Sequence, residues 1–247
     1  MSGVLLVTGA SRGIGAATAL AGARAGYAVA VHYGVHLGEA DAVCAKILSN
    51  GGKAIVVQGD MALETDIVSM FKTIDSELGT ITALVNNAGS VIAVRAITDI
   101  DSSIIDRILA VNLAGPIYCC REAVRRMSTA CGGKGGAIVN ISSMAALLGG
   151  LPNEVPYAAT KGGVDSLTIG LAREVATQGI RVNAIRPGVI DTPIHAFHGE
   201  GFIERFSPNL PMQRAGTADE VAEAAIWLLS SAASYVTGSI LNVSGGR

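Results

Sequence analysis

The stretch GVLLVTGASRGIG, residues 3–15, joins an apolar run of strand length to a glycine-rich turn, and an alanine-rich segment of helical character follows it. A strand, a glycine turn and a helix start together form a cradle for a phosphate. The glycines let the backbone come close, and the unpaired N–H groups of the helix start face the anion. The spacing of Gly9, Gly13 and Gly15 is not the familiar G-x-G-x-x-G. Taken alone, the turn is equally compatible with a purely structural role.

Outward from this stretch, apolar runs alternate with segments of helical period. The runs lie near residues 27–32, 53–58, 83–86, 136–142, 180–186 and 239–243, and the helical segments near 37–50, 63–78, 101–129, 156–178 and 217–231. Strand and helix in alternation imply right-handed crossovers and a parallel sheet covered on both faces. The sequence therefore predicts an α/β, doubly wound Rossmann fold of about seven strands, as a single domain over residues 1–247.

A tyrosine and a lysine four residues apart, Tyr157 and Lys161, fall on one face of a predicted helix. Lowering the pKa of a phenol from about 10 to neutrality takes about 4 kcal/mol. A cation about 4 Å away supplies roughly that much at an effective dielectric of about 20. We therefore expect Lys161 to lower the pKa of Tyr157 and make it a proton donor and acceptor. The alternative is an ordinary solvated helix face.

A pair of hydroxyl groups ends the apolar run 138–141, where open α/β sheets bind their ligands. Ser143 is placed to hydrogen-bond the same substrate oxygen as Tyr157, and Ser142 competes with it for this role.

The ordered set of these motifs with Asn86-Asn87-Ala88-Gly89, Asn112 and Pro187-Gly188 resembles the short-chain dehydrogenase/reductase family over nearly the whole chain. Within it, the chain is most similar to the oxoacyl-carrier-protein reductase and glucose dehydrogenase-like subgroup. The resemblance implies a catalytic set of Asn112, Ser143, Tyr157 and Lys161. It also shows one extra residue between Ser143 and Tyr157, within 149–154, which should reshape one wall of the substrate pocket.

The same resemblance implies a nicotinamide cofactor and the residues that hold it: Gly9, Ser11, Arg12, Gly13, Ile14, Gly15, Tyr33, Asp60, Met61, Asn87, Ala88, Gly89, Tyr157, Lys161, Pro187, Gly188, Ile190 and Thr192. An acid at the end of the second strand would favour NAD, but the stretch 31–36 has none. Arg12 is placed to pair with a 2′-phosphate. We expect NADP, with NAD as the alternative.

The composition of the chain indicates which kinds of binding partner to expect. The net charge of −2 offers no attraction for nucleic acid or an anionic membrane, and no apolar run approaches the length of a membrane span. We expect a cytoplasmic protein without a leader. The 50% hydrophobic content favours an oligomer, and the resemblance implies a homotetramer paired through the segments 101–129 and 156–178. Four unpaired cysteines suggest buried thiols, and four scattered histidines suggest no metal site.

We therefore expect an oxidoreductase that transfers a hydride between NADP and a small carbonyl or alcohol substrate, with Tyr157 as general acid and base. A lid near residues 193–214 should close over the substrate. Two alternatives stay open: an NAD-dependent sugar or polyol dehydrogenase, and a cofactor-binding regulatory protein without turnover. The sequence fixes neither the substrate nor the direction of reaction.

Overall fold

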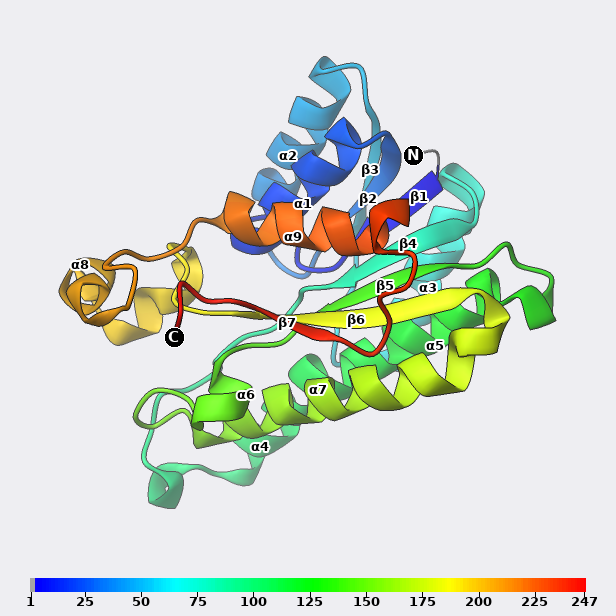
Figure 1. Cartoon of the computed structure of the whole chain (residues 1–247). Helices are drawn as coiled ribbons and strands as arrows, with labels where there is room; N and C mark the ends of the chain where they lie inside the picture. Colours follow the sequence, from blue (N-terminus) through cyan, green and yellow to red (C-terminus); the bar gives the residue numbers. More distant parts are fainter. Residues whose placement is uncertain (1–2) are drawn as a thin grey trace.

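Seven parallel strands form one sheet at the centre of the computed structural model, which describes residues 3–247 (Figure 1). The strands are β1 (Gly3–Val7), β2 (Tyr27–Tyr33), β3 (Lys53–Gln58), β4 (Ile81–Asn86), β5 (Gly136–Ile141), β6 (Ile180–Pro187) and β7 (Ile240–Val243). Their order is β3-β2-β1-β4-β5-β6-β7, and every neighbouring pair is parallel. The order reverses between β1 and β4, so the ligand crevice of such a sheet lies at the carboxyl ends of these two strands.

Helices cover both faces of the sheet (Figure 1). One face carries α1 (Gly13–Arg24), α2 (Leu37–Ser49) and α9 (Ala218–Leu229). The other carries α3 (Glu64–Glu77), α4 (Ser102–Leu109), α5 (Gly115–Met127) and α7 (Val155–Val175). The short helices are α6 (Ala145–Leu148) and α8 (Phe202–Phe206), with 3-10 turns at Ile97–Asp99, Thr129–Cys131, Ala176–Gln178, Pro193–His198, Ser207–Asn209 and Ser231–Ala233. The predicted single-domain Rossmann fold is confirmed.

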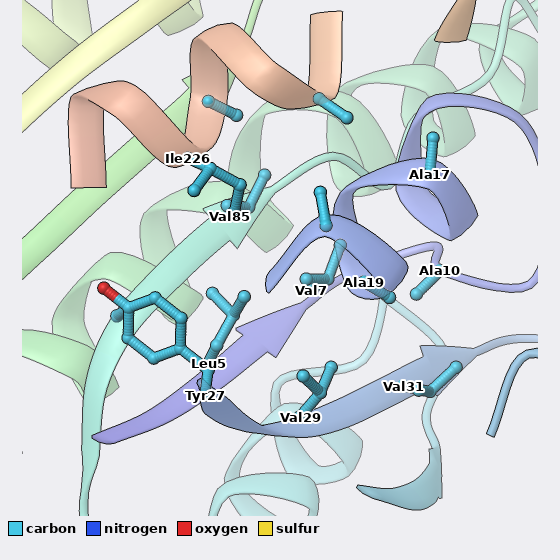
Figure 2. Close-up of a cluster of buried hydrophobic side chains, with 14 of the residues drawn as sticks. Leu5, Val7, Ala10, Ala17, Ala19, Tyr27, Val29, Val31, Val85 and Ile226 are labelled. Carbon is cyan, nitrogen blue, oxygen red and sulfur yellow. The ribbon is translucent and has the colours of Figure 1, made fainter. Parts of the chain in front are cut away.

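The strands bury side chains on both faces, which is why they appear in the sequence as unbroken apolar runs. In β1, Leu5 and Val7 pack towards α1 and α9, whereas Val4 and Leu6 belong to the core on the opposite face. Figure 2 shows the first of these clusters, with Leu5, Val7 and Val29 beneath α1 and Ile226 reaching down from α9.

The segment predicted as one helix over 101–129 is two helices joined by a π-helical turn, Ala110–Ala114. In the part of the chain that is described, the stretch Ser102–Met127 is long and apolar enough for a membrane span by length and composition, with a mean hydropathy of 1.3 and 33% burial over an 18-residue window. It also carries Asp106 and Arg107 and ends in further charged residues, and α5 packs against β4. By length and composition alone, a helix of a folded domain passes the same test.

The cysteines do not all behave as expected. Cys44, Cys119 and Cys120 are buried and unpaired, but Cys131 is exposed, so the expectation of four buried thiols is wrong for that residue. The reason is its position in the 3-10 turn Thr129–Cys131, which connects α5 to β5 at the surface. Residues 3–247 contain no cluster of three side chains suited to a metal ion.

Substitution of Phe71 on α3 tests the packing of the core on the face of the sheet that carries α3, because this side chain is fully buried there. Phe71→Ala should lower the free energy of unfolding by about 3–5 kcal/mol, because the site loses its contacts and keeps a cavity. Urea denaturation at fixed protein concentration measures this loss. Leu63→Ala, at a half-exposed position before α3, is the control and should change the same quantity by less than about 1 kcal/mol. Equal losses for the two variants would contradict this account of the core.

Candidate active site

Two adjoining cavities open at the carboxyl ends of the strands. The larger, a groove of about 500 Å³, is lined by the glycine turn, the ends of β2 and β3 and the loop after β4. The smaller, a chamber of about 120 Å³, is lined by Ser143, Tyr157 and Lys161, the segment after β6 and residues of the predicted lid. They share the lining residues Ile14, Asn87, Gly89, Thr192 and Ile194. We call them the groove and the chamber.

The glycine turn brings backbone, rather than side chains, to the groove. Gly9 and Gly13 have positive φ values of 62° and 57°, which residues with a side chain rarely adopt. A Cβ on Gly15 would overlap the carbonyl oxygen of Gly9. Arg12 begins α1 without a side-chain cap, so the first N–H groups of the helix have no side-chain acceptor there. Such a helix start is suited to an anion such as a pyrophosphate.

The turn is anchored from the neighbouring strand by Asn87. Its amide Nδ2 donates to the carbonyl oxygens of Thr8 (2.9 Å) and Gly9 (3.0 Å). In return, the Thr8 hydroxyl accepts from the backbone N–H groups of Asn87 and Ala88. Gly9, Ser11, Arg12, Gly13 and Ile14 line the groove together with Asn87, Ala88 and Gly89, whereas Gly15 lies behind them. The predicted cofactor residues of β1 and β4 thus meet at one place.

His32 has a structural role that the sequence analysis missed. Its ring is buried; Nδ1 accepts from the backbone N–H of Gly9 (2.9 Å), and Nε2 lies 3.0 Å from the Gly59 carbonyl oxygen. Burial lowers the pKa of His32. The neutral ring with its proton on Nε2 satisfies both contacts and joins the glycine turn to the end of β3. A lone polar residue within an apolar strand was the available signal.

At the end of β2 the groove is lined by Gly34, Val35 and His36, while the predicted cofactor residue Tyr33 is buried in the core and does not line it. Arg12 also lines the groove and is exposed. The groove therefore carries a cation from the turn and no acid from the end of β2.

Asp60 and Met61 line the groove at the end of β3. The Asp60 carboxylate accepts from Arg107 of α4 (2.9 Å) and from the backbone N–H of Ala62 (2.9 Å). The hydrogen bond from Arg107 is the main reason that the pKa of Asp60 lies below its usual value. Arg107, also a groove residue, had no sequence signal, because its partner is 47 positions away.

Asn112 lies in the π-helical turn and is fully buried, so it lines neither cavity. It exchanges two hydrogen bonds with the backbone of Ser90, at 2.8 and 2.9 Å, and donates to Thr160 Oγ1 at 3.3 Å. Asn112 therefore ties the loop after β4 to α7 at the residue before Lys161.

Tyr157 and Ser143 meet in the chamber. Tyr157 stands in the first turn of α7, and its phenol is hydrogen-bonded to Ser143. The competing serine is used differently, since the Ser142 hydroxyl donates to the backbone oxygen of Lys161 (3.2 Å). The geometry favours Ser143 as the hydroxyl that shares a substrate oxygen with Tyr157.

The expected effect of Lys161 on Tyr157 is wrong in this structure. Burial raises the pKa of Tyr157 to about 12, with the Ser143 hydrogen bond opposing and Glu154 adding to the rise. Lys161 Nζ lies 5.7 Å from the centre of the tyrosine ring and donates instead to the Ile141 carbonyl oxygen (2.8 Å). Burial also lowers the pKa of Lys161 to about 8, and Asp165 opposes this. Desolvation therefore outweighs the attraction that the helical spacing suggested.

The segment after β6 forms the wall between the two cavities. Pro187, Gly188 and Ile190 line the chamber, and Thr192 lines both cavities. Two backbone hydrogen bonds fix the segment, from Gly188 N to Val243 O (2.9 Å) and from Met144 N to Pro187 O (3.0 Å).

The outer wall of the chamber comes from the predicted lid and from the loop that holds the extra residue. Ile194, His195 and His198 of the lid face Leu148, Leu151 and Glu154 across it, and Arg247 completes the lining. Arg247 escaped the sequence analysis, because no local motif connects position 247 to this site. An apolar wall with a few polar groups beside the Tyr157 and Ser143 hydroxyls is suited to a small polar substrate.

Comparisons with known proteins agree with this geometry. Residues 9–247 match the family described as Enoyl-(Acyl carrier protein) reductase. The chain is 51% identical to the uncharacterized oxidoreductase YgfF of Escherichia coli, over 99% of each chain. It is also 39% identical to a 3-oxoacyl-[acyl-carrier-protein] reductase of Synechocystis, over 98% of this chain and 96% of the relative.

Solved structures give the same result. A short chain dehydrogenase from Burkholderia cenocepacia, crystallised in complex with NADP, superposes with a TM-score of 0.91 at 32% identity, covering 99% of this chain and 97% of the other. A dehydrogenase/reductase from Sinorhizobium meliloti gives 0.92 at 32% identity, over 99% and 94%.

The fold and the site together define an oxidoreductase of the Rossmann class. The match over residues 9–247 and the similarity to these relatives show which family of oxidoreductases it is. The chain belongs to the short-chain dehydrogenase/reductase family.

Lys161 gives the stability of the protein a pH dependence. Between about pH 8 and pH 10.5 the unfolded chain keeps the Lys161 proton and the folded chain loses it, so stability gains from this residue as pH rises. Below that window the full burial penalty applies, at most about 3 kcal/mol. Chemical denaturation of the wild type and of Lys161→Met measures this dependence. Between pH 8 and pH 10 the free energy of unfolding of the wild type should rise relative to that of the variant. A difference independent of pH would contradict a buried lysine with a lowered pKa.

Proposed function

We propose that the protein catalyses the NADPH-dependent reduction of a small carbonyl compound, and the reverse oxidation of its alcohol, with Tyr157 as the general acid and base. The supporting observation is that Tyr157, its hydrogen-bonded Ser143 and the cation of Lys161 line one small chamber that adjoins the nucleotide-sized groove. The acid therefore stands in the chamber that adjoins the groove.

The groove fits a nicotinamide dinucleotide. The backbone of the glycine turn would hold the pyrophosphate, Asp60 and Met61 the adenine end, and the segment 187–192 the nicotinamide end. Lys161 would hold the nicotinamide ribose, as the family resemblance implies. When bound, the cofactor supplies a hydride to the carbonyl carbon of the substrate.

Residues of the chain supply the proton for the carbonyl oxygen and stabilise the negative charge that develops on it. Tyr157 Oη donates a proton to the carbonyl oxygen, and the Ser143 hydroxyl stabilises the negative charge that develops on it. Asn112 keeps α7 and the loop after β4 in place around Tyr157 and Lys161. The chamber excludes most water, which strengthens each of these interactions.

NADP is the proposed cofactor because Arg12 lines the groove, which has no acid at the end of β2. The solved relative from Burkholderia cenocepacia was crystallised with NADP, which supports the same choice. The alternatives from the sequence make distinct predictions. A sugar or polyol dehydrogenase would turn over faster with NAD and a polyol, and a regulatory protein would bind NADPH without any hydride transfer.

We also propose that the active form is a cytoplasmic homotetramer. The α4–α5 stretch leaves Leu109 and Ile117 more than 40% exposed, and α7 leaves Val155 55% exposed. Pairing these helices with their copies would cover the apolar side chains. Sedimentation at four times the monomer mass supports this assembly, and a monomer at micromolar concentration contradicts it. Free cysteines are in keeping with the reducing cytoplasm.

Tyr157→Phe removes only the hydroxyl that donates the proton. Hydride transfer from NADPH should fall by at least about a thousandfold, while the affinity for NADPH stays within about threefold. Absorbance at the NADPH band measures turnover across a panel of small carbonyl compounds, and fluorescence titration measures binding. Tyr235→Phe, at a fully exposed position, is the matched control. Activity that survives in Tyr157→Phe removes Tyr157 as the acid.

Gly34→Asp tests the position of the 2′-phosphate. A Cβ at Gly34 has no neighbour closer than 3.9 Å, so the new side chain fits. Its charge should repel the phosphate and shift the ratio of kcat/KM for NADPH over NADH by at least about tenfold towards NADH. Gly34→Asn has the same shape without the charge and should shift the ratio much less. Equal shifts for Asp and Asn would mean that the phosphate lies elsewhere.

A further inference from the structure

A single ion pair joins the lid (residues 193–214) to the helix that carries Tyr157. His198 Nε2 lies 3.0 Å from Glu154 Oε1, and both side chains are largely buried, with 11% and 5% of their surface exposed. Both line the chamber. Most other ion pairs in residues 3–247 involve a side chain that is at least a third exposed, so this pair has an unusual place in the molecule.

Glu154 is fixed by its own surroundings. Its second oxygen, Oε2, accepts from the backbone N–H of Leu151 (2.9 Å), and its backbone oxygen accepts from Ala158 N (3.0 Å) in the first turn of α7. The loop that it ends contains Asn153 with a positive φ of 69°, a conformation that asparagine adopts more readily than most residues. The Glu154 carboxylate therefore holds the loop with the extra residue against the start of α7, three residues before Tyr157.

His198 is held by an aromatic stack. Its ring lies 4.6 Å from that of Phe202, which stacks on His195 at 5.2 Å and on Phe206 at 5.2 Å. Arg247 covers the far end, with its guanidinium 5.2 Å from the Phe206 ring. The 3-10 turn Pro193–His198 and α8 thus form one packed unit. From this unit, His198 contacts Glu154 on the other wall of the chamber.

We propose that Glu154 and His198 are positioning residues for the proposed reaction: their contact closes the lid over the chamber, and the Nε2–H group of His198 stabilises the carboxylate that acts on Tyr157. This inference rests on the proposed function. Opening the lid would break the contact and leave the Glu154 carboxylate without this donor. Closure of the lid over a substrate is thereby linked to the pKa of Tyr157.

The charges around the two residues support this assignment. Glu154 raises the pKa of Tyr157, so an uncompensated carboxylate makes the phenol a weaker acid. Lys161 faces Tyr157 from the next turn of α7, 5.7 Å from the ring. On the lid side, the neutral ring of His195 lies 5.8 Å from His198, and burial lowers the pKa of His195 to about 4. His198 is therefore the lid group placed to balance Glu154.

Two variants break the contact from opposite sides. Glu154→Gln removes the negative charge, and His198→Gln removes the group that balances it. Both should speed backbone hydrogen exchange in residues 193–209 by at least about fivefold and raise KM for the carbonyl substrate. The rising limb of kcat against pH for alcohol oxidation should move to lower pH in Glu154→Gln and to higher pH in His198→Gln, each by at least about half a unit.

Glu39→Gln is the matched control, since it breaks an exposed contact between a histidine and a glutamate, His36–Glu39 at 3.7 Å. It should leave exchange in 193–209 and the position of the limb unchanged. Faster exchange with limbs that do not move apart would reduce the pair to a purely structural contact and overturn the proposal. Unchanged exchange would overturn it as well. If no carbonyl compound is reduced, the proposed function fails, and the exchange rates still decide whether the pair closes the lid.

Discussion

The close approach of two backbones at the switch point between β1 and β4 is the constraint on which the rest of this structure depends. A Cβ on Gly9 would lie 2.9 Å from the Cα of Ala88, and the Asn87 amide holds the Gly9 carbonyl from the same side. His32 holds the same turn from the side of β2. Three strands are thereby fixed at their carboxyl ends before any ligand contributes. The groove keeps its shape because its walls are hydrogen-bonded main chain, which has little freedom to move.

Desolvation is the second force that shapes the site, and it opposes the chemistry that the residues are placed to do. Burial disfavours the charged form of both Tyr157 and Lys161, so each is neutral over a wider pH range than in water. Local hydrogen bonds and charges then shift the two pKa values further. Ser143 and Glu154 act on the phenol in opposite directions, and Asp165 favours the charged amine. Such a site is tuned by its neighbours more than by the spacing of the pair itself.

The fold and most of the site followed from sequence because both are encoded locally. The apolar run 3–7 and the glycines after it fix a strand and a turn in one segment, and the Tyr157–Lys161 spacing fixes a helix face. What local patterns could not reveal were partners distant in sequence. Arg107 reaches Asp60, Arg247 reaches the chamber, and Lys161 bonds Ile141 instead of acting on the phenol. The π-helical turn at Asn112 was also missed, because such turns are rare and residues 110–114 are types that ordinary helices also contain.

The two cavities draw on different parts of the chain. Most of the groove is built from residues before position 112, whereas the chamber is built mainly from residues after position 140. Sequence drift in the second half can therefore alter what is reduced while the nucleotide half stays intact. A chimera that takes its first half from one homologue and its second half from another would keep most of the groove lining and exchange most of the chamber lining, together with Lys161 and the segment 187–192.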